Sequence, residues 1–180
     1  MMPGSRSAVG SFPVEQRRVP PAALVSAMVA TTILVIDQST KVMIRSILLP
    51  CTNGSCDTLH AGPFAIINQT NTGSAFGFHP GSPLWVLLAM VSVLLVPVYG
   101  SRLRSVADRT WTLPIALGLV AGGALGNLTD RLLYGGATDF LVPGAYVTLN
   151  LADVAVLIGT AMTIAILLRN RARLRARRTS

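Results

Sequence analysis

The stretch AGGALGNLTDRLLYGGATDFLVPGAYVTLNLAD (residues 121–153) places acidic side chains in and beside segments apolar enough to lie in lipid. It holds three of the protein's seven carboxylates: Asp130, Asp139 and Asp153. Because an ionised aspartate near the middle of a bilayer costs roughly 2.5–3.5 kcal/mol, such residues are usually functional. The same polar pattern occurs twice, as NLTD (residues 127–130) and NLAD (residues 150–153), and each Asn and Asp would share one helix face. The stretch therefore predicts a polar pocket inside a helical membrane bundle, with two carboxylates performing acid–base chemistry.

The composition is that of a membrane protein. Of the 180 residues, 51% are hydrophobic and only 12% are charged, and the mean hydropathy is +0.58. A chain of this length corresponds to one domain. The net charge of +8 would suggest nucleic-acid binding in a soluble protein, but here the basic residues flank apolar segments. We therefore expect no nucleic-acid partner.

Four apolar runs are long enough to be transmembrane helices, which need about 17–25 residues. They cover about residues 21–49, 83–99, 111–133 and 145–168. The predicted fold class is a membrane all-α protein, a four-transmembrane-helix bundle formed by residues 21–168. Residues 1–20 are expected to be a flexible cytoplasmic tail, and residues 169–180 a basic cytoplasmic tail.

The distribution of arginine predicts the orientation of these helices. Three arginines lie in residues 1–20, three in residues 100–110 and six in residues 169–180, whereas the loops at about 50–82 and 135–144 contain no Lys or Arg. Because cytoplasmic loops are enriched in Lys and Arg, both termini are predicted to be cytoplasmic and these two loops external. At about 1.5 Å per residue along a helix, four carboxylates then gather near the outer face: Asp37, Asp130, Asp139 and Asp153.

The external loop of about residues 50–82 is rich in Gly, Asn, Thr, Ser and Pro. Residues 64–71 have the character of a short strand and residues 73–78 continue it after a turn, which predicts a small β-sheet between the first two helices. The only two cysteines, Cys51 and Cys56, lie in this loop on the oxidising side. The sequence leaves open whether they form a local disulfide or remain free thiols.

Three polar or small-residue features of the helices need interpretation. Asp37 and Lys41 lie four residues apart, and form either an ion pair at the water boundary or a pair that orients substrate or anchors the outer loop. Gly122 and Gly126 have the spacing that lets membrane helices pack closely. Arg131 either extends to lipid phosphate groups or pairs with a carboxylate.

Asn150 and Asp153 either cap the fourth helix or belong to the acid–base pair. The positive end of that helix favours a negative charge on Asp153, whereas a second carboxylate nearby opposes it. Such a pair holds one protonated acid and one carboxylate base, as the activation of water against an amide requires. The residues alone do not decide whether the partner of Asp153 is Asp130 or Asp139.

No other catalytic machinery is evident in the sequence. His60 and His79 lack the spacing of a metal-binding motif, so we expect no metal and no other cofactor. The serines lack a nucleophile motif, and neither cysteine has an evident histidine partner. Aspartates are the candidates that remain.

Five short motifs occur in order over about residues 30–165: DQSTK (37–41), NTGSAFG (71–77), GNLTDR (126–131), TDF (138–140) and NLAD (150–153). With them the chain resembles the bacterial lipoprotein signal peptidases, the type II signal peptidase family of intramembrane aspartyl proteases. The resemblance implies a membrane aspartyl endopeptidase that removes signal peptides from diacylglyceryl-modified prolipoproteins and cuts before the lipidated cysteine. It also implies the bacterial cytoplasmic membrane as the location, with the active site near the outer face.

The family motifs further imply a role for each site residue. The catalytic pair falls on Asp139 and Asp153, which leaves Asp130 in a supporting position. Asp37 and Lys41 match the rim of the family's pocket, and five residues match its lining: Asn71, Gly73, Asn127, Arg131 and Asn150. The implied partners are lipid-modified prolipoproteins, membrane lipids and the cyclic-peptide antibiotic that inhibits the family. We expect the protein to be a monomer.

The chain departs from the family pattern at Leu149, where Phe is usual, and at Ser74, where Ala is common. The loop between the two implied catalytic aspartates is also short. Two alternative functions are a catalytically inactive relative that binds lipoprotein precursors and a proton-coupled transporter component. The second alternative predicts polar groups across the whole membrane depth, whereas the carboxylates gather in its outer third.

Overall fold

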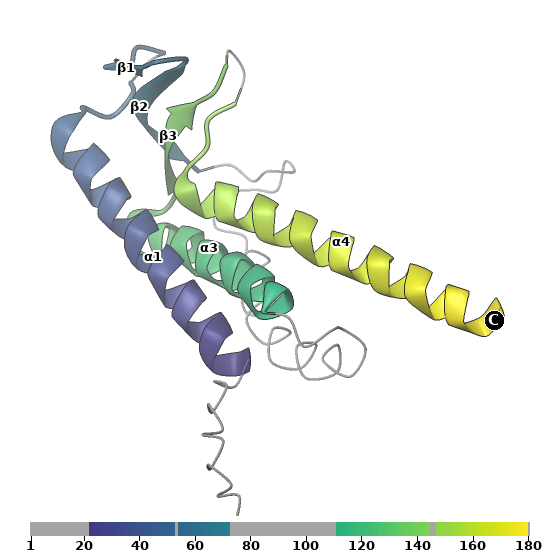
Figure 1. Ribbon diagram of the computed structural model, residues 1–180. Helices are drawn as coiled ribbons and strands as arrows, with labels where there is room; N and C mark the ends of the chain where they lie inside the picture. Colours follow the sequence, from purple (N-terminus) through teal and green to yellow (C-terminus); the bar gives the residue numbers. More distant parts are fainter. Residues whose placement is uncertain (1–21, 53, 73–110, 145–146, 180) are drawn as a thin grey trace, which may run out of the picture.

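The computed structural model describes residues 22–52, 54–72, 111–144 and 147–179 (Figure 1). These residues form α1 (Ala22–Ile47), β1 (Leu59–Ala61), β2 (Phe64–Asn71), α3 (Thr112–Tyr134), β3 (Ala137–Val142) and α4 (Leu151–Thr179). The predicted second helix at 83–99, the predicted strand at 73–78 and the tail of residues 1–20 lie outside the described residues.

All three described helices are long and apolar enough to cross a membrane, over Ala22–Ile47, Thr112–Tyr134 and Leu151–Arg173. Helix α3 packs against both α1 and α4, and Figure 1 shows it between them. Large apolar side chains such as Met28 and Leu157 remain exposed along the helices, as expected for surfaces that face lipid. The structure therefore confirms a membrane-type fold with three apolar helices and a small antiparallel sheet.

Glycines on two faces of α3 allow this close packing. A Cβ atom at Gly122 would lie 2.6 Å from a main-chain oxygen of α1, and one at Gly126 would lie 2.6 Å from Oδ2 of Asp37. A Cβ atom at Gly123 would collide with the main-chain oxygen of Ala152 in α4. The close helix approach predicted from the spacing of Gly122 and Gly126 is therefore confirmed.

The three strands form one antiparallel sheet in the order β1-β2-β3. Figure 1 shows the sheet at the end of the helices where α1 stops and α4 starts. It rests on α1 through a small core of Ile44, Leu48 and Phe140. Strand β2 contains one extra residue relative to β3, because Ile66 pairs with Leu141 but Gln69 pairs with Asp139. This bulge lies directly before the pairing that contains Asp139.

The prediction that residues 135–144 form a loop is wrong, because Ala137–Val142 form strand β3. The sheet is therefore not confined to the segment between the first two helices. A strand of six residues between a glycine pair and a proline carries little local signal, and its partner β2 is distant in the sequence. Gly135 makes the turn before β3. It ends α3 with a φ of 75° and donates its N–H to the oxygen of Arg131 at 3.2 Å.

Helix α4 differs from its predicted range at both ends. It begins at Leu151 rather than near residue 145, because the preceding residues bridge to β3 and Asn150 caps the helix. It continues past residue 168 to Thr179. The last turns are rich in Arg, Ala and Leu, which favour helix, so the helix outlasts the apolar run on which the prediction depends.

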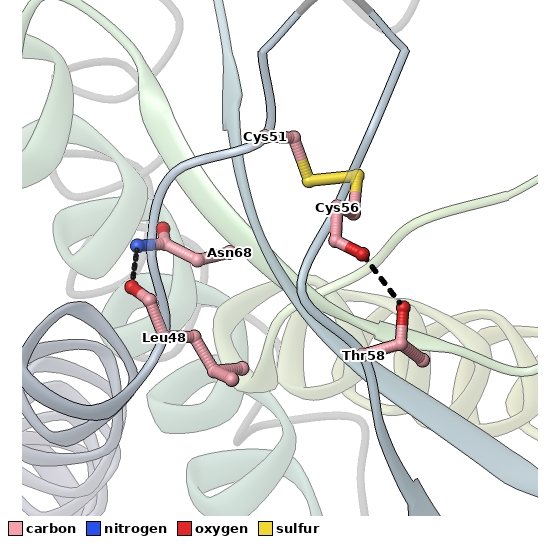
Figure 2. The surroundings of a disulfide bond; sticks show 5 residues. All are labelled: Leu48, Cys51, Cys56, Thr58 and Asn68. Atoms are coloured by element: carbon pink, nitrogen blue, oxygen red, sulfur yellow. Dashed lines mark hydrogen bonds between the residues drawn. A yellow bond between two sulfur atoms is a disulfide. The ribbon is translucent and has the colours of Figure 1, made fainter.

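Cys51 and Cys56 form a disulfide in the loop that joins α1 to β1 (Figure 2). This finding decides between the two alternatives that the sequence leaves open. The Cys51 N–H donates to the main-chain oxygen of Asn68 at 2.8 Å, and the side-chain amide of Asn68 donates to the oxygen of Leu48 at 2.8 Å. The loop and the bulged part of β2 are thereby fastened to the end of α1.

Replacing both Cys51 and Cys56 by serine is expected to lower stability only modestly. The loop that the disulfide closes is short, so its loss costs about 2 kcal/mol by chain entropy. The hydrogen bonds of Asn68 remain and keep β2 on α1. Thermal unfolding in detergent should show a small fall in Tm, matched by wild-type protein treated with dithiothreitol. Failure of the double variant to fold would contradict this expectation.

Candidate active site

Two carboxylates from different elements share one site. Asp139 lies on β3 with only 2% of its surface exposed, and Asp153 lies partly buried in the first turn of α4. They are close enough that the charge of Asp153 raises the pKa of Asp139. The structure thus brings Asp139 to Asp153, whereas Asp130 lies among cationic side chains.

Two asparagine side chains connect the carboxylates. Asn150 donates from Nδ2 to Oδ1 of Asp139 at 2.6 Å and to Oδ1 of Asn127 at 3.0 Å. Asn127 in turn donates from Nδ2 to Oδ1 of Asp153 at 2.7 Å. A third amide, that of Asn71 in β2, donates to Oδ2 of Asp139 at 2.9 Å. A continuous chain of amide hydrogen bonds therefore fixes the direction of each carboxylate.

The N-terminus of α4 orients Asp153 through a reciprocal cap. Asn150 Oδ1 accepts from the N–H of Asp153 at 2.9 Å, and Asp153 Oδ2 accepts from the N–H of Asn150 at 3.2 Å. The N–H of Ala152 donates at 2.9 Å to Oδ1 of Asp37, which reaches across from α1. The helix cap predicted for Asn150 and Asp153 is therefore confirmed, and the same two residues also belong to the amide chain.

A buried ion cluster lies next to the amide chain. Lys41 Nζ is 2.8 Å from Oδ2 of Asp37 and 3.2 Å from Oδ2 of Asp130, and all three side chains are 0% exposed. Lys41 also donates to Oδ1 of Asn127 at 3.0 Å. The predicted ion pair of Asp37 and Lys41 is present, but both side chains are fully buried, so its expected place at the water boundary is wrong. Contacts with α3 and with the N-terminus of α4 enclose both side chains.

Asp130 holds β3 against α3. Its Oδ2 accepts from the N–H of Thr138 at 2.8 Å, and its Oδ1 accepts from Nε2 of Gln38 at 3.1 Å. Arg45 Nη1 lies 3.6 Å from the same Oδ1. The sequence prediction assigns no role to these three contacting residues. Gln38 and Thr138 lie inside the DQSTK and TDF motifs, so the motifs could have identified them as site residues. Arg45 lies in none of the motifs, and the sequence gives no indication of its role.

Arg131 and Gly73 complete the set of predicted site residues. Arg131 is partly buried and donates from Nη1 to the main-chain oxygen of Asn127 at 3.2 Å, so it lies beside the amide chain. Gly73 lies outside the described residues, as does Ser74. Leu149 pairs with β3 through its main chain. Within the described ranges, no group of three His, Cys, Asp or Glu side chains is arranged to hold a metal ion.

The pKa of Asp139 is raised from its usual 3.8 to about 6, chiefly because the carboxyl is buried. The charge of Asp153 contributes to this increase. Hydrogen bonds from Asn71 and Asn150, together with the charge of Lys41, act in the opposite direction without cancelling the increase. One member of the pair therefore keeps its proton well above the usual range. An acid–base pair needs this asymmetry, because one member must donate and the other accept a proton at the same pH.

The raised pKa predicts that Asp139 destabilises the folded protein at neutral pH. The folded protein binds this proton more tightly than the unfolded chain does, so the contribution of Asp139 is fully favourable below pH 3.8 and is lost as the pH rises through about 6. The stability of Asp139→Asn relative to wild type is therefore expected to increase by roughly 3 kcal/mol from about pH 4 to about pH 8. Thermal unfolding of both proteins across this range measures the difference. A difference that does not change with pH would contradict the expectation.

The family model described as Signal peptidase (SPase) II matches residues 29–169 of the chain. The chain is 31% identical over 153 residues to a lipoprotein signal peptidase of Maridesulfovibrio salexigens, covering 81% of this chain and 96% of that protein. It is 35% identical over 132 residues to the lipoprotein signal peptidase of Pelotomaculum thermopropionicum, covering 73% and 84%. It is 36% identical over 138 residues to that of Nitratidesulfovibrio vulgaris, covering 72% and 81%.

Two solved structures, each described as a bacterial membrane enzyme determined by the in meso method, have a similar fold. One matches with a TM-score of 0.70 at 23% identity, covering 82% of this chain and 90% of its own. The other matches with a TM-score of 0.62 at 25% identity, covering 79% and 92%. The arrangement of helices and sheet is therefore that of a membrane enzyme.

Proposed function

The chain belongs to the signal peptidase II family, and from this premise we propose that Asp139 and Asp153 are its catalytic pair. Since its relatives are named lipoprotein signal peptidases, the chain is an aspartic endopeptidase that removes signal peptides from prolipoproteins. Its substrates carry a diacylglyceryl group, and the cut falls directly before the lipidated cysteine. The observation that carries the proposal is the amide chain that joins the two carboxylates through Asn150 and Asn127.

In the proposed mechanism the two acids share one proton. Asp139, whose pKa is raised to about 6, carries that proton, and Asp153, at the positive end of α4, is the carboxylate base. Asp153 takes a proton from water, and the water oxygen attacks the scissile carbonyl carbon while Asp139 hydrogen-bonds to the carbonyl oxygen. The proton held by Asp153 then passes to the leaving nitrogen as the C–N bond breaks. Both acids then have their initial protonation states again. The assistance of each acid raises the rate by a factor on the order of 10²–10⁴.

The amide chain supports this mechanism by directing the acids. Asn127 Oδ1 accepts from both Lys41 and Asn150, so its Nδ2 has to face Asp153. The reversed amide would place its N–H groups against two other donors. Lys41, together with Asn150, therefore sets the direction of the amide that holds Asp153, although its hydrogen bond goes to Asn127 and not to either acid.

We further propose that residues 83–99 form a fourth transmembrane helix and that both termini are cytoplasmic. The apolar run itself and the arginines at 100–110 and 169–180 support this topology. The acid pair then lies near the outer face of the bacterial cytoplasmic membrane, next to the lipid chains of the substrate. Pocket residues would include Asn71, Gly73 and Arg131. Because one chain supplies both acids and their amides, a monomer suffices for activity.

A cleavage assay tests the proposal. Purified protein in detergent is incubated with a diacylglyceryl-modified precursor and, as the matched control, with the same precursor without lipid. The expected result is cleavage of the lipidated precursor directly before the modified cysteine, blocked by the cyclic-peptide antibiotic that inhibits the family. Binding of this precursor without cleavage would identify a catalytically inactive relative and overturn the proposal.

A further inference from the structure

Thr138, the residue before Asp139 in β3, is held by side chains from two helices. Its N–H donates to Oδ2 of Asp130 in α3 at 2.8 Å. Its hydroxyl oxygen accepts from Nη1 of Arg45 in α1 at 2.6 Å. Thr138 is only 3% exposed, so both hydrogen bonds are largely shielded from water. The main chain and the side chain of this residue are thus fixed by separate partners.

Within the part of the chain that the structure describes, the shortest polar contact of the Arg45 guanidinium is with Thr138. It lies 4.3 Å from the centre of the Tyr134 ring, within the range of a cation–π interaction. Its Nη1 is 3.6 Å from Asp130, farther than the 3.2 Å that separates Asp130 from Lys41. Its Nη2 is buried without a hydrogen-bond partner among the described residues. Arg45 adds to the neutralisation of Asp130, because Lys41 is shared between Asp37 and Asp130. The contact of Arg45 with the Thr138 hydroxyl, at 2.6 Å, is nevertheless much shorter than its contact with Asp130.

We propose that Arg45 is a positioning residue for Asp139 and that it acts through the hydroxyl of Thr138. The inference rests on the proposed catalytic role of Asp139. Successive side chains of a strand point to opposite faces, so a contact that fixes the face of Thr138 also fixes the face of Asp139. Rotation of β3 about its own axis would move the carboxylate away from Asn150 and Asn71, which it meets at 2.6 and 2.9 Å.

The β2–β3 ladder is regular on only one side of Asp139. The extra residue of β2 interrupts the regular pairing between Ile66 and Gln69, directly before the position where Gln69 pairs with Asp139. A bulge locally disrupts the ladder and increases the twist of the strands. Thr138 itself pairs with Thr70 in the regular part of the ladder, and its side-chain contact with α1 adds a second restraint next to the bulge.

The test measures kcat and KM separately for cleavage of a diacylglyceryl-modified precursor by the full-length protein. Arg45→Met and Thr138→Val are each expected to lower kcat about tenfold with KM unchanged, since each removes one charge-assisted hydrogen bond. Thr138→Ser keeps the hydroxyl and is expected to keep the wild-type kcat. The double variant Arg45→Met/Thr138→Val should be no slower than either single variant, because both changes remove the same contact.

Arg169→Met is the matched control, since it removes an exposed arginine from the far part of α4, and it is expected to leave kcat unchanged. An unchanged kcat in Arg45→Met, or losses that multiply in the double variant, would overturn the inference. Equal losses of kcat in Thr138→Ser and Thr138→Val would overturn the inference as well. If Arg45→Met does not fold, the comparison of these two Thr138 variants is sufficient to test the inference. Asp139→Asn in the same assay tests the proposed function separately, because full cleavage by that variant would reject the catalytic pair and leave the Arg45 data unaffected.

Discussion

Asp139→Asn and Asp153→Asn are each expected to abolish cleavage of a diacylglyceryl-modified precursor, with kcat falling by about 10³-fold or more. Asparagine has nearly the shape of aspartate, but at position 153 it cannot take a proton from water, and at position 139 it lacks the acidic proton that polarises the scissile carbonyl. The remaining acid cannot perform both tasks in one turnover. Separation of precursor and product on gels over a long incubation measures the residual rate.

The two substitutions also disturb the hydrogen bonds around the acids. Both oxygens of Asp139 accept from amide donors, those of Asn150 and Asn71, so an amide at this position would turn its N–H groups against one of them. Asp153 accepts from Asn127 and from the N–H of Asn150, with the same consequence. Each conflict costs about 1–3 kcal/mol. Thermal unfolding has to accompany the cleavage assay, so that loss of chemistry is separated from loss of folded protein.

Asp57→Asn is the matched control for both variants. It makes the same chemical change at an exposed aspartate in the loop before β1, and it is expected to leave the cleavage rate unchanged. If Asp139→Asn or Asp153→Asn were folded and cleaved precursor as fast as Asp57→Asn, the proposed pair would be ruled out. Folded but inactive variants at both positions, with an active control, would support it.

Features with a local signal could be predicted from the sequence. The apolar runs at 21–49 and 111–133 correspond closely to α1 (Ala22–Ile47) and α3 (Thr112–Tyr134), because helix length in a membrane follows from the length of the run. The cap at Asn150 is likewise visible, since an Asn followed three residues later by Asp is typical of a helix start.

Features that depend on distant contacts could not be predicted from the residues. Asp130 and Asp139 are equal candidates in the sequence, and only the family resemblance favours Asp139. The structure separates them through long-range partners: Lys41 lies beside Asp130, whereas an amide from β2, that of Asn71, meets Asp139. No periodicity in the sequence reveals that β3 pairs with β2 or that Arg45 contacts it.

Lys41→Met is expected to have the largest effect on stability. Lys41 is the cation within hydrogen-bonding distance of both Asp37 and Asp130, and all three side chains are fully buried. Removing one partner of a buried ion pair leaves an uncompensated charge and costs about 3–5 kcal/mol. The variant is therefore expected to give little folded protein, with a large fall in Tm for the part that folds. Purified yield and thermal unfolding in the same detergent measure both effects.

The double variant Asp37→Asn/Lys41→Met separates two roles of Lys41. It restores the charge balance of the cluster, because Asp130 keeps Arg45 at 3.6 Å, and Oδ1 of an asparagine at 37 still accepts from Ala152. Part of the lost stability should therefore return. Cleavage should stay below the wild-type rate, because Oδ1 of Asn127 has lost its cationic donor and Asn150 alone then holds the amide in its orientation. Full recovery of cleavage would contradict the orienting role of Lys41, and a double variant no more stable than Lys41→Met would contradict the charge-balance argument.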